Sequence, residues 1–321
     1  MALAKVFIDG QEGTTGLKIR ERFAGRDDIT LIRIDENERK NPEARAACIN
    51  ASDFTFLCLP DAAAREAVAL RTNPATRILD ASTAHRTAPD WAYGFPELAP
   101  EFRTRIAEAA QVAVPGCYAS GFLALCRPLV RAGVLPPDYP VVCHAVSGYS
   151  GAGKKAVAQY EDPNRTPDLD APRQYALTQR HKHLPEMRMI AGLAFDPVFN
   201  PYICDFFCGM AVTVPLHTRL LAKSVTAENI REILAAHYDE SRFVRCLPFA
   251  GENAADDAAG LGGFIAANNL AGTNRMELVV SGNNERVILT ARFDNLGKGA
   301  SGAAVQCLNI MLGIPEDTGL N

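Results

Sequence analysis

The first 116 residues alternate short apolar runs with longer amphipathic stretches, and this alternation is the feature that most constrains the fold. The apolar runs are typical of strands: KVFID (5–9), ITLIRI (29–34), FTFLCLP (54–60), TRILDAS (76–82) and AQVAVPG (110–116). Helical patterns such as TGLKIRERFAG and AAAREAVALRTN lie between several of them. Elements in this order form right-handed βαβ units, so we expect an α/β domain with a mostly parallel sheet.

Beyond residue 117 the pattern changes to longer strand-like stretches: YPVVCHAVSGYS, DFFCGMAVTVPLH, MELVVSGNN and RVILTARFDN. A helical segment, TAENIREILAAHYDES, lies among them. We therefore expect an α+β domain whose largely antiparallel sheet has one covered face. The chain closes with GKGASGAAVQCLNIMLG, whose apolar residues recur at helical spacing, and we expect this helix to return to the first domain.

Composition narrows the class of protein. A chain of 321 residues with 48% hydrophobic residues can bury the cores of two domains. Its net charge of −4, with dispersed basic residues, gives no general attraction to nucleic acid or to an anionic membrane. The N-terminus enters a strand pattern without the features of a signal peptide, and no apolar run approaches the roughly 20 residues that span a bilayer. We expect a cytoplasmic protein.

Cysteine usage predicts reduced thiols, because the nine cysteines follow no regular framework and a chain of this size folds without disulfides. No metal site is expected, since Cys204 and Cys208 lack a second pair or a nearby histidine. Cys117 stands apart, because it follows a Pro-Gly turn and precedes the helical pattern YASGFLALCRPL. The dipole and free N–H groups at a helix N-terminus lower the pKa of a thiol and stabilise an oxyanion, so Cys117 is the predicted nucleophile.

Three glycines, Gly10, Gly13 and Gly16, lie directly between the first predicted strand and the first predicted helix. They let the backbone approach a ligand closely, and the N–H groups of the helix start favour a phosphate there. The spacing G-x-x-G-x-x-G differs from the common G-x-G-x-x-G fingerprint of dinucleotide-binding proteins. A plain strand-to-helix turn is therefore the alternative interpretation.

The segment IRIDENERK, after the second predicted strand, bears on the choice between NAD and NADP. Asp35 is placed to hydrogen-bond a ribose 2′-hydroxyl, which favours NAD. The basic residues Arg33, Arg39 and Lys40 are equally placed to neutralise the 2′-phosphate of NADP. The residues of this segment leave both cofactors open.

A cysteine nucleophile needs an acid/base partner, and the stretch QRHKHLPEMRMI offers His181 and His183 followed by Glu186. A carboxylate at this spacing is suited to orient an imidazole, although an H-x-H pair is also common on exposed surfaces. The stretch VSGYSGAGKKAV contains Lys154 after a run of small residues, either to approach an anionic substrate group or as part of a flexible surface loop.

A set of motifs, in order and over nearly the whole chain, resembles one known family. The motifs are DGQEGTTGL, DASTAHR, YGFPEL, VPGCYAS, AVSGYSGAGK, KHLPE and DNLGKGASGAAVQCLNIMLG. Together they are similar to the shorter form of the N-acetyl-γ-glutamyl-phosphate reductases, an arginine-biosynthesis family related to aspartate-semialdehyde dehydrogenase. The chain departs from the usual family pattern at Val114, Ala119 and Ser120 and keeps the cysteine and histidine motifs.

The resemblance implies a two-domain organisation. Residues 1–116 would form a Rossmann domain that binds NADP(H), completed by the C-terminal helix, 297–321. Residues 117–296 would form the catalytic and oligomerisation domain. The resemblance further implies a homodimer or homotetramer that acts on a small-molecule acyl phosphate.

The resemblance also implies roles for individual residues. Cys117 would be the nucleophile, His183 the general acid/base and Glu186 its catalytic support. The implied cofactor-binding residues are Gly10, Gly13, Thr14, Thr15, Gly16, Arg33, Ser82 and Asn295. The implied substrate contacts are Arg86, Ser147, His181 and Lys154.

The implied activity is the NADPH-dependent reduction of N-acetyl-L-glutamyl 5-phosphate to N-acetyl-L-glutamate 5-semialdehyde with release of phosphate, through a thioacyl intermediate on Cys117. Two alternatives differ from it. In one the chemistry is the same and the acyl phosphate is another, for example aspartyl phosphate. In the other the chain is a non-catalytic NADPH-binding protein in which Cys117 is a redox sensor.

Overall fold

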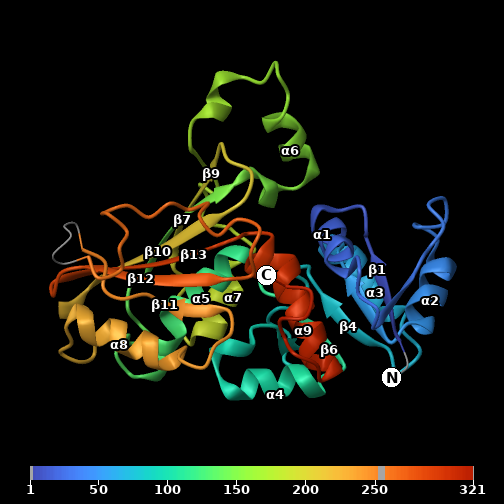
Figure 1. The fold of residues 1–321 in the computed structure, drawn as a ribbon, viewed down its shortest axis with the longest axis horizontal. Coiled ribbons are helices and arrows are strands. Elements are labelled where there is room, and N and C mark those ends of the chain that lie inside the picture. The colour runs from blue at the N-terminus through green and yellow to red at the C-terminus, as the bar shows by residue number, and fades with distance from the viewer. Residues whose placement is uncertain (1–2, 252–256, 321) are drawn as a thin grey trace. The chain divides into compact units, whose positions relative to one another are not determined.

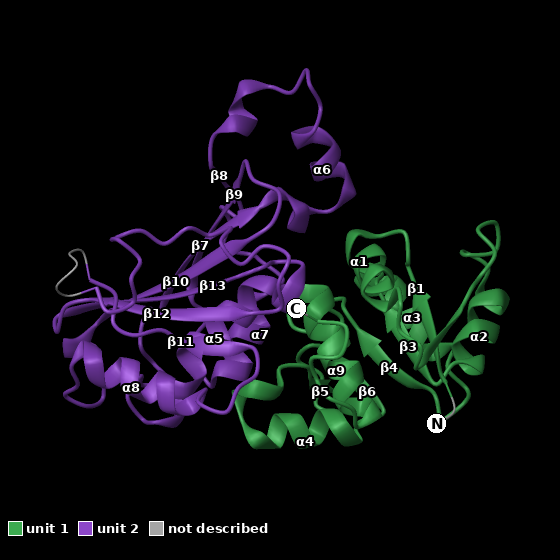
Figure 2. Cartoon of the chain, in the orientation of Figure 1, with its two compact units in different colours: residues 1–116, 300–321 green, residues 117–299 purple. Residues whose placement is uncertain are grey.

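The computed structural model describes residues 3–251 and 257–320. The chain divides into two compact units, one formed by residues 1–116 with 300–321 and the other by residues 117–299 (Figures 1 and 2). The second unit runs to Gly299, whereas the sequence analysis ended the second domain at residue 296. Among the described residues, no helix is both long enough and apolar enough to cross a membrane.

Unit 1 is built on a six-stranded parallel sheet with the order β2-β1-β3-β4-β6-β5. Its strands are β1 (Ala4–Asp9), β2 (Ile29–Ile32), β3 (Phe54–Leu57), β4 (Arg77–Asp80), β5 (Ala92–Tyr93) and β6 (Gln111–Ala113). The strand order reverses between β1 and β3, so this pair forms the switch point where doubly wound sheets bind ligands. The predicted parallel sheet is confirmed; its short edge strand β5 was not predicted.

Both faces of this sheet are covered by helices. The helices are α1 (Thr14–Phe23), α2 (Pro42–Ala51), α3 (Asp61–Ala69), α4 (Pro100–Glu108), α9 (Gly302–Leu312) and the 3₁₀ turn η1 (Pro96–Leu98). Val6 and Ile8 of β1 pack in one core with residues of α1, α4 and α9, whereas Phe7 packs in a second core with α2 and α3. Successive residues of a strand point to opposite faces of the sheet, so each face has its own core. The C-terminal helix α9 is buried and apolar because it covers one of these two faces.

Unit 2 contains a seven-stranded mixed sheet with the order β11-β12-β13-β10-β7-β9-β8. Its strands are β7 (Val142–Gly148), β8 (Arg173–Gln174), β9 (Val198–Cys204), β10 (Met210–His217), β11 (Val244–Cys246), β12 (Met276–Gly282) and β13 (Arg286–Phe293). Its centre is antiparallel, as expected, while the pairs β7–β9 and β11–β12 are parallel. The two strands of a parallel pair are joined by a long connection, so their pairing cannot be predicted from the pattern of neighbouring residues.

The helices of unit 2 are α5 (Cys117–Arg131), α6 (Lys154–Tyr160), α7 (Leu184–Ala191) and α8 (Ala227–His237), with the 3₁₀ turns η2 (Tyr149–Ala152), η3 (Pro167–Asp170) and η4 (Thr218–Leu220). The π-helical turn η5 (Gly297–Ser301) includes the last residues of unit 2 and the first of the C-terminal part of unit 1. Helix α5 packs on β10 and β13 and also against α7 and α8 (Figure 1). Gly121 permits this approach, because a Cβ there would lie 2.7 Å from Cγ2 of Val212. On β13, Val287 is buried and Ile288 is 41% exposed, so the helices cover one face of the sheet.

Candidate active site

Cys117 is the first residue of α5, and its side chain is half-buried. Its thiol is therefore at the positive end of a helix of 15 residues, where the first backbone N–H groups have no partner in the helix. Gly299 lies against it, because a Cβ at residue 299 would be 3.0 Å from Cβ of Cys117. By contrast, burial raises the pKa of Cys126 and Cys143, so those thiols stay protonated in the core.

His181 and His183 lie together at the start of α7. His183 immediately precedes the helix and is only 5% exposed. Its backbone N–H donates to Nδ1 of His181 at 3.1 Å, and the two rings are perpendicular with their centres 4.7 Å apart. A ring nitrogen that accepts a hydrogen bond carries no proton, so a neutral His181 holds its proton on Nε2.

Glu186 lies beside His183, as the sequence predicted from their spacing. Residues three apart share a helix face, and α7 brings Oε1 of Glu186 to 4.0 Å from Nε2 of His183. This distance is that of an ion pair and is too long for a direct hydrogen bond between the two atoms. Because Glu186 is 1% exposed, little solvent screens its charge, and the carboxylate stabilises positive charge on the imidazole.

Tyr118 and Tyr175 complete this group, and the sequence analysis missed both. The ring of Tyr118 lies 5.9 Å from that of His183, 6.0 Å from that of His181 and 6.4 Å from that of Tyr175. Burial raises the pKa of both phenols, and the nearby charge of Cys117 raises the pKa further, so both stay protonated. We call Cys117, Tyr118, Tyr175, His181 and His183 the cysteine–histidine cluster.

The remaining predicted site residues of unit 2 lie on the strand ends and loops. Ser147 is buried on β7, and its hydroxyl donates to the carbonyl oxygen of Gly148 at 3.1 Å. Asn295 is buried; its Oδ1 accepts from the N–H of Gly209 and its Nδ2 donates to the hydroxyl of Ser150. Lys154 is exposed at the start of α6 and has no ion pair among the described residues. The substrate contacts of Ser147 and Lys154 and the nicotinamide contact of Asn295 stay predictions.

In unit 1 the glycine loop joins β1 to α1 at the switch point of the sheet. Gly10 has a φ of +84°, and a Cβ there would lie 2.4 Å from the carbonyl oxygen of Cys58. Gly16 is equally confined, since its Cβ would lie 2.6 Å from the carbonyl oxygen of Gly10. Gly13 is the N-cap of α1 and makes no side-chain hydrogen bond to the first turn. The N–H groups of Thr14 and Thr15 at the start of this helix are therefore suited to bind a phosphate.

The DASTAHR motif folds around Asp80, which is fully buried at the end of β4. Asp80 accepts from the N–H and the hydroxyl of Ser82, and it lies 2.6 Å from Nδ1 of His85. His85 stacks face to face on Trp91, with ring centres 4.1 Å apart. Arg86 donates to the carbonyl oxygens of Val114 and Ala81, which ties the ends of β4 and β6 together. Contacts of Ser82 with cofactor and of Arg86 with a substrate phosphate stay predictions.

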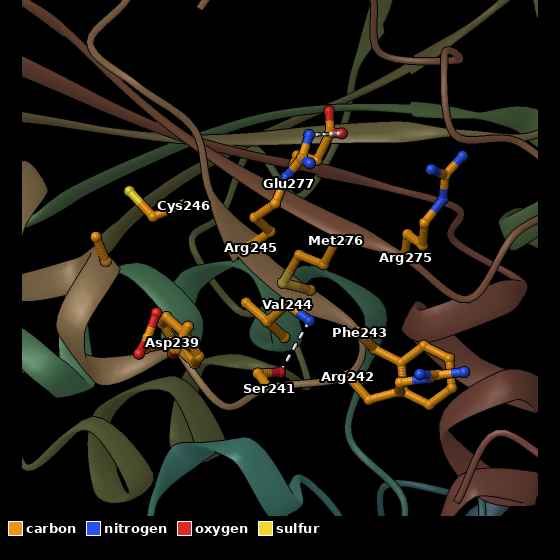
Figure 3. Close-up of a pocket in the computed structure, with 12 residues that line it drawn as sticks. Asp239, Ser241, Arg242, Phe243, Val244, Arg245, Cys246, Arg275, Met276 and Glu277 are labelled. Carbon is orange, nitrogen blue, oxygen red and sulfur yellow. Dashed lines mark hydrogen bonds and ion pairs between the residues drawn. The ribbon is translucent and has the colours of Figure 1, made fainter.

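Each unit also contains at least one cavity. A cavity of about 630 Å³ in unit 1 is lined by the exposed Arg33 together with Gln11 and Arg20, next to the glycine loop. A cavity of about 410 Å³ in unit 2 lies at the edge strand β11, where Arg245 pairs with Glu277 (Figure 3). The second cavity contains none of the predicted site residues.

Two family models match the chain. The model described as semialdehyde dehydrogenase, NAD binding domain, matches residues 5–106, and the model described as semialdehyde dehydrogenase, dimerisation domain, matches residues 117–295. The first match lies in unit 1 and the second in unit 2. A parallel-sheet nucleotide domain joined to a domain with a cysteine at a helix N-terminus defines the class: a semialdehyde dehydrogenase-type oxidoreductase.

Curated relatives identify the family within this class. The chain is 50% identical over 320 residues to the N-acetyl-gamma-glutamyl-phosphate reductase of Burkholderia lata, which covers 98% of both chains. It is 47% identical over 312 residues to N-acetyl-gamma-glutamyl-phosphate reductase 2 of Pseudomonas putida, which covers 96% of both. The chain therefore belongs to the N-acetyl-gamma-glutamyl-phosphate reductase family, and the resemblance read from its motifs is confirmed.

Solved structures support the fold. Aspartate semialdehyde dehydrogenase II of Vibrio cholerae aligns with a TM-score of 0.69 at 14% identity, over 98% of this chain and 99% of that one. The aspartate semialdehyde dehydrogenase of Francisella tularensis aligns with a TM-score of 0.70 at 12% identity, over 97% of this chain and 100% of that one. At such identities the likeness is one of fold alone.

Proposed function

We propose that this protein reduces N-acetyl-L-glutamyl 5-phosphate to N-acetyl-L-glutamate 5-semialdehyde, with release of phosphate, as a step of arginine biosynthesis. The observation that carries the proposal is the cysteine–histidine cluster: a half-buried thiol at a helix N-terminus, with an imidazole pair beside a buried carboxylate. Relatives of known name that share the fold and about half of the sequence support the choice of substrate.

Cys117 acts as the nucleophile. Its thiolate attacks the acyl carbon, the carbon–oxygen bond to phosphate breaks, and phosphate leaves with that electron pair while the thioester forms. The N–H groups of the first turn of α5 stabilise the negative oxygen that develops during the attack. A thioester is the useful intermediate because it accepts a hydride far more readily than a carboxylate does.

His183 moves the proton. It accepts the thiol proton of Cys117 before the attack, and it holds a proton for the carbonyl oxygen while the thioester is reduced. When the carbon–sulfur bond breaks, the proton returns to His183 and Cys117 leaves as a thiolate, so the cycle closes. Glu186 stabilises the imidazolium form of His183 during these steps.

A nicotinamide cofactor fits the glycine loop, because the N-cap of α1, Gly13, has no side-chain hydrogen bond and leaves the first N–H groups of the helix to a phosphate. Gly10, Gly13, Gly16, Thr14 and Thr15 would hold its phosphates. When bound in its reduced form, the nicotinamide supplies the hydride. We assign NADP(H) as the cofactor, with Arg33 beside the cavity of unit 1 as the residue that neutralises the 2′-phosphate.

The enzyme assembles through unit 2 as a homodimer or homotetramer and acts in the cytoplasm. The family model for residues 117–295, described as a dimerisation domain, supports assembly through this unit. The exposed apolar side chains of the uncovered sheet face, such as Ile288, are consistent with it.

The test is the reverse reaction, with N-acetyl-L-glutamate 5-semialdehyde, phosphate and either NADP or NAD, followed by the absorbance of the reduced nicotinamide. We expect phosphate-dependent formation of NADPH by the wild type and none by Cys117→Ser, with NADPH binding retained. Cys48→Ser, the same change on α2 of unit 1, is the matched control and should be fully active. Faster turnover of aspartate semialdehyde would assign another acyl phosphate, and NADPH binding with no turnover of either aldehyde would favour a redox sensor.

A further inference from the structure

Tyr118 is buried although it directly follows the half-buried nucleophile. It is 5% exposed, and its ring packs among side chains from three other segments of unit 2. Besides the two histidines it contacts Tyr175 after β8 and Phe199 on β9, whose ring centre lies 5.2 Å away. The side chain therefore reaches from the start of α5 to the segment that carries the histidines.

The hydroxyl of Tyr118 lies near the hydroxyls of Tyr175 and Ser147, which act on its pKa in opposite directions, Tyr175 upward and Ser147 downward. Ser147 is on the central strand β7, which gives the chain of hydroxyls a fixed end. The ring of Tyr118 thus has both a set position and a set orientation.

The segment that carries the histidines needs such support, because its backbone is strained and belongs to no helix or strand. Ala176 and Gln179 both have a φ of +56°, the left-handed region that disfavours residues with a Cβ. The side chain of Gln179 makes two hydrogen bonds to the backbone of Phe199: its Nε2 donates to the carbonyl oxygen, and its Oε1 accepts from the N–H. Gln179 fixes one side of the segment, and the ring of Tyr118 contacts the other side through His181 and His183.

We propose that Tyr118 is a positioning residue for the reaction: it fixes the imidazoles of His181 and His183 relative to the thiol of Cys117. It acts through these groups and takes no part in bond making. The inference rests on the proposed function, since the proton transfer that it supports is the one assigned there to His183.

The decisive variant is Tyr118→Phe, which keeps the ring and removes only the hydroxyl. We expect kcat to fall about ten-fold, the KM for the semialdehyde to stay within two-fold, and the melting temperature to change little. Tyr160→Phe is the matched control: Tyr160 is also buried in unit 2, and its hydroxyl has no hydrogen-bond partner among the described residues. The control should keep full activity. Tyr175→Phe, which leaves the neighbouring hydroxyl of Ser147 in place, should have an intermediate effect.

A second readout does not depend on the substrate. The rate of alkylation of Cys117 by iodoacetamide is measured against pH in the wild type and in Tyr118→Phe. If Tyr118 positions the imidazoles, the variant shifts the pH profile of alkylation, because the ionisation of Cys117 is coupled to the histidines. Among the described residues, Tyr118, Tyr175 and Glu186 are titratable groups packed against the pair.

An unchanged kcat and an unchanged alkylation profile in Tyr118→Phe would overturn the inference. A fall in melting temperature with an unchanged alkylation profile would also overturn it, since it would assign Tyr118 to folding alone. If the wild type turns over no acyl phosphate substrate while the alkylation profile still shifts, the proposed function fails and the positioning of the histidines stands.

Discussion

The backbone N–H of His183 donates to Nδ1 of His181 at 3.1 Å, so the imidazole of His181 holds the backbone of His183 at the start of α7. This bond means that the two imidazoles have different partners. His181 is committed as an acceptor through Nδ1, whereas His183 faces the carboxylate of Glu186. This geometry supports the proposal that His183 is the acid/base, and the substrate contact implied for His181 stays a prediction.

His181→Phe should therefore impair catalysis without removing the acid/base. The variant keeps an aromatic ring but leaves the N–H of His183 without its acceptor, which costs about 1–3 kcal/mol for a buried donor. We expect lower stability in urea and a kcat reduced at least ten-fold. His217→Phe, the same change at an exposed position of β10, is the control. An unchanged kcat in His181→Phe would show that this bond has no part in placing His183.

Glu186→Gln tests the charge beside His183. The glutamine has the same shape and no negative charge, so the imidazolium loses its stabilisation and deprotonates at a lower pH. We expect the alkaline limb of the pH–rate profile to move down by about 1 pH unit, with kcat at neutral pH reduced. Glu232→Gln, on the outer surface of α8, should leave the profile in place. A shift in the opposite direction would contradict the role assigned to Glu186.

Local patterns in the sequence were enough to predict the parts of the fold that depend on neighbouring residues. The strands of unit 1 were found from the period of their apolar residues, and Cys117 was placed at a helix start because Val114-Pro115-Gly116 stops one element before the next begins. Strand β5 was missed because it has only two residues, and helices α2 and α4 were not singled out. The pairing of β7 with β9 could not be predicted from a local pattern, because the long segment that contains α6 and η3 separates the two strands.

The role of Tyr118 could not be predicted from its neighbours in the chain. Its partners Ser147, Tyr175 and Phe199 come from three separate segments that meet only when α5 packs against α7 and the sheet. The only signal in the sequence was its place after the nucleophile. Ser82 and Arg86 are a related case, since the sequence pointed to a site and the structure adds the internal hydrogen bonds that hold their loop.

Arg45→Met should destabilise the protein in a pH-dependent way. Arg45 pairs at 2.9 Å with Asp9, both side chains are buried, and burial raises the pKa of Asp9 despite this pairing. Without the guanidinium, an unpaired carboxylate remains in the core, which costs about 3–5 kcal/mol at neutral pH.

The sign of the pH effect follows from the raised pKa of Asp9. The folded state binds a proton on Asp9 more readily than the unfolded state does, so the penalty shrinks as the pH falls and Asp9 becomes neutral. We expect urea unfolding to show a smaller difference from the wild type at pH 5 than at pH 7. The double variant Asp9→Asn/Arg45→Met should recover part of the loss, and a pH-independent loss would mean that the unpaired charge is not its cause.

Gly10→Ala tests whether the glycine loop binds the cofactor by its close backbone approach. The residue has a φ of +84°, and the new Cβ would meet the carbonyl oxygen of Cys58 at 2.4 Å, so the loop must move away from β3. Gly25→Ala is the matched control, because Gly25 has a φ of +82° and nothing within 4 Å of the position of its Cβ. Both variants carry the cost of a left-handed backbone, about 1–2 kcal/mol, and only Gly10→Ala displaces the loop. We expect NADPH affinity, measured by fluorescence titration, to fall at least ten-fold in Gly10→Ala and to stay within two-fold of the wild type in Gly25→Ala. Equal affinities in the two variants would mean that the loop is a plain strand-to-helix turn and that the phosphates bind elsewhere.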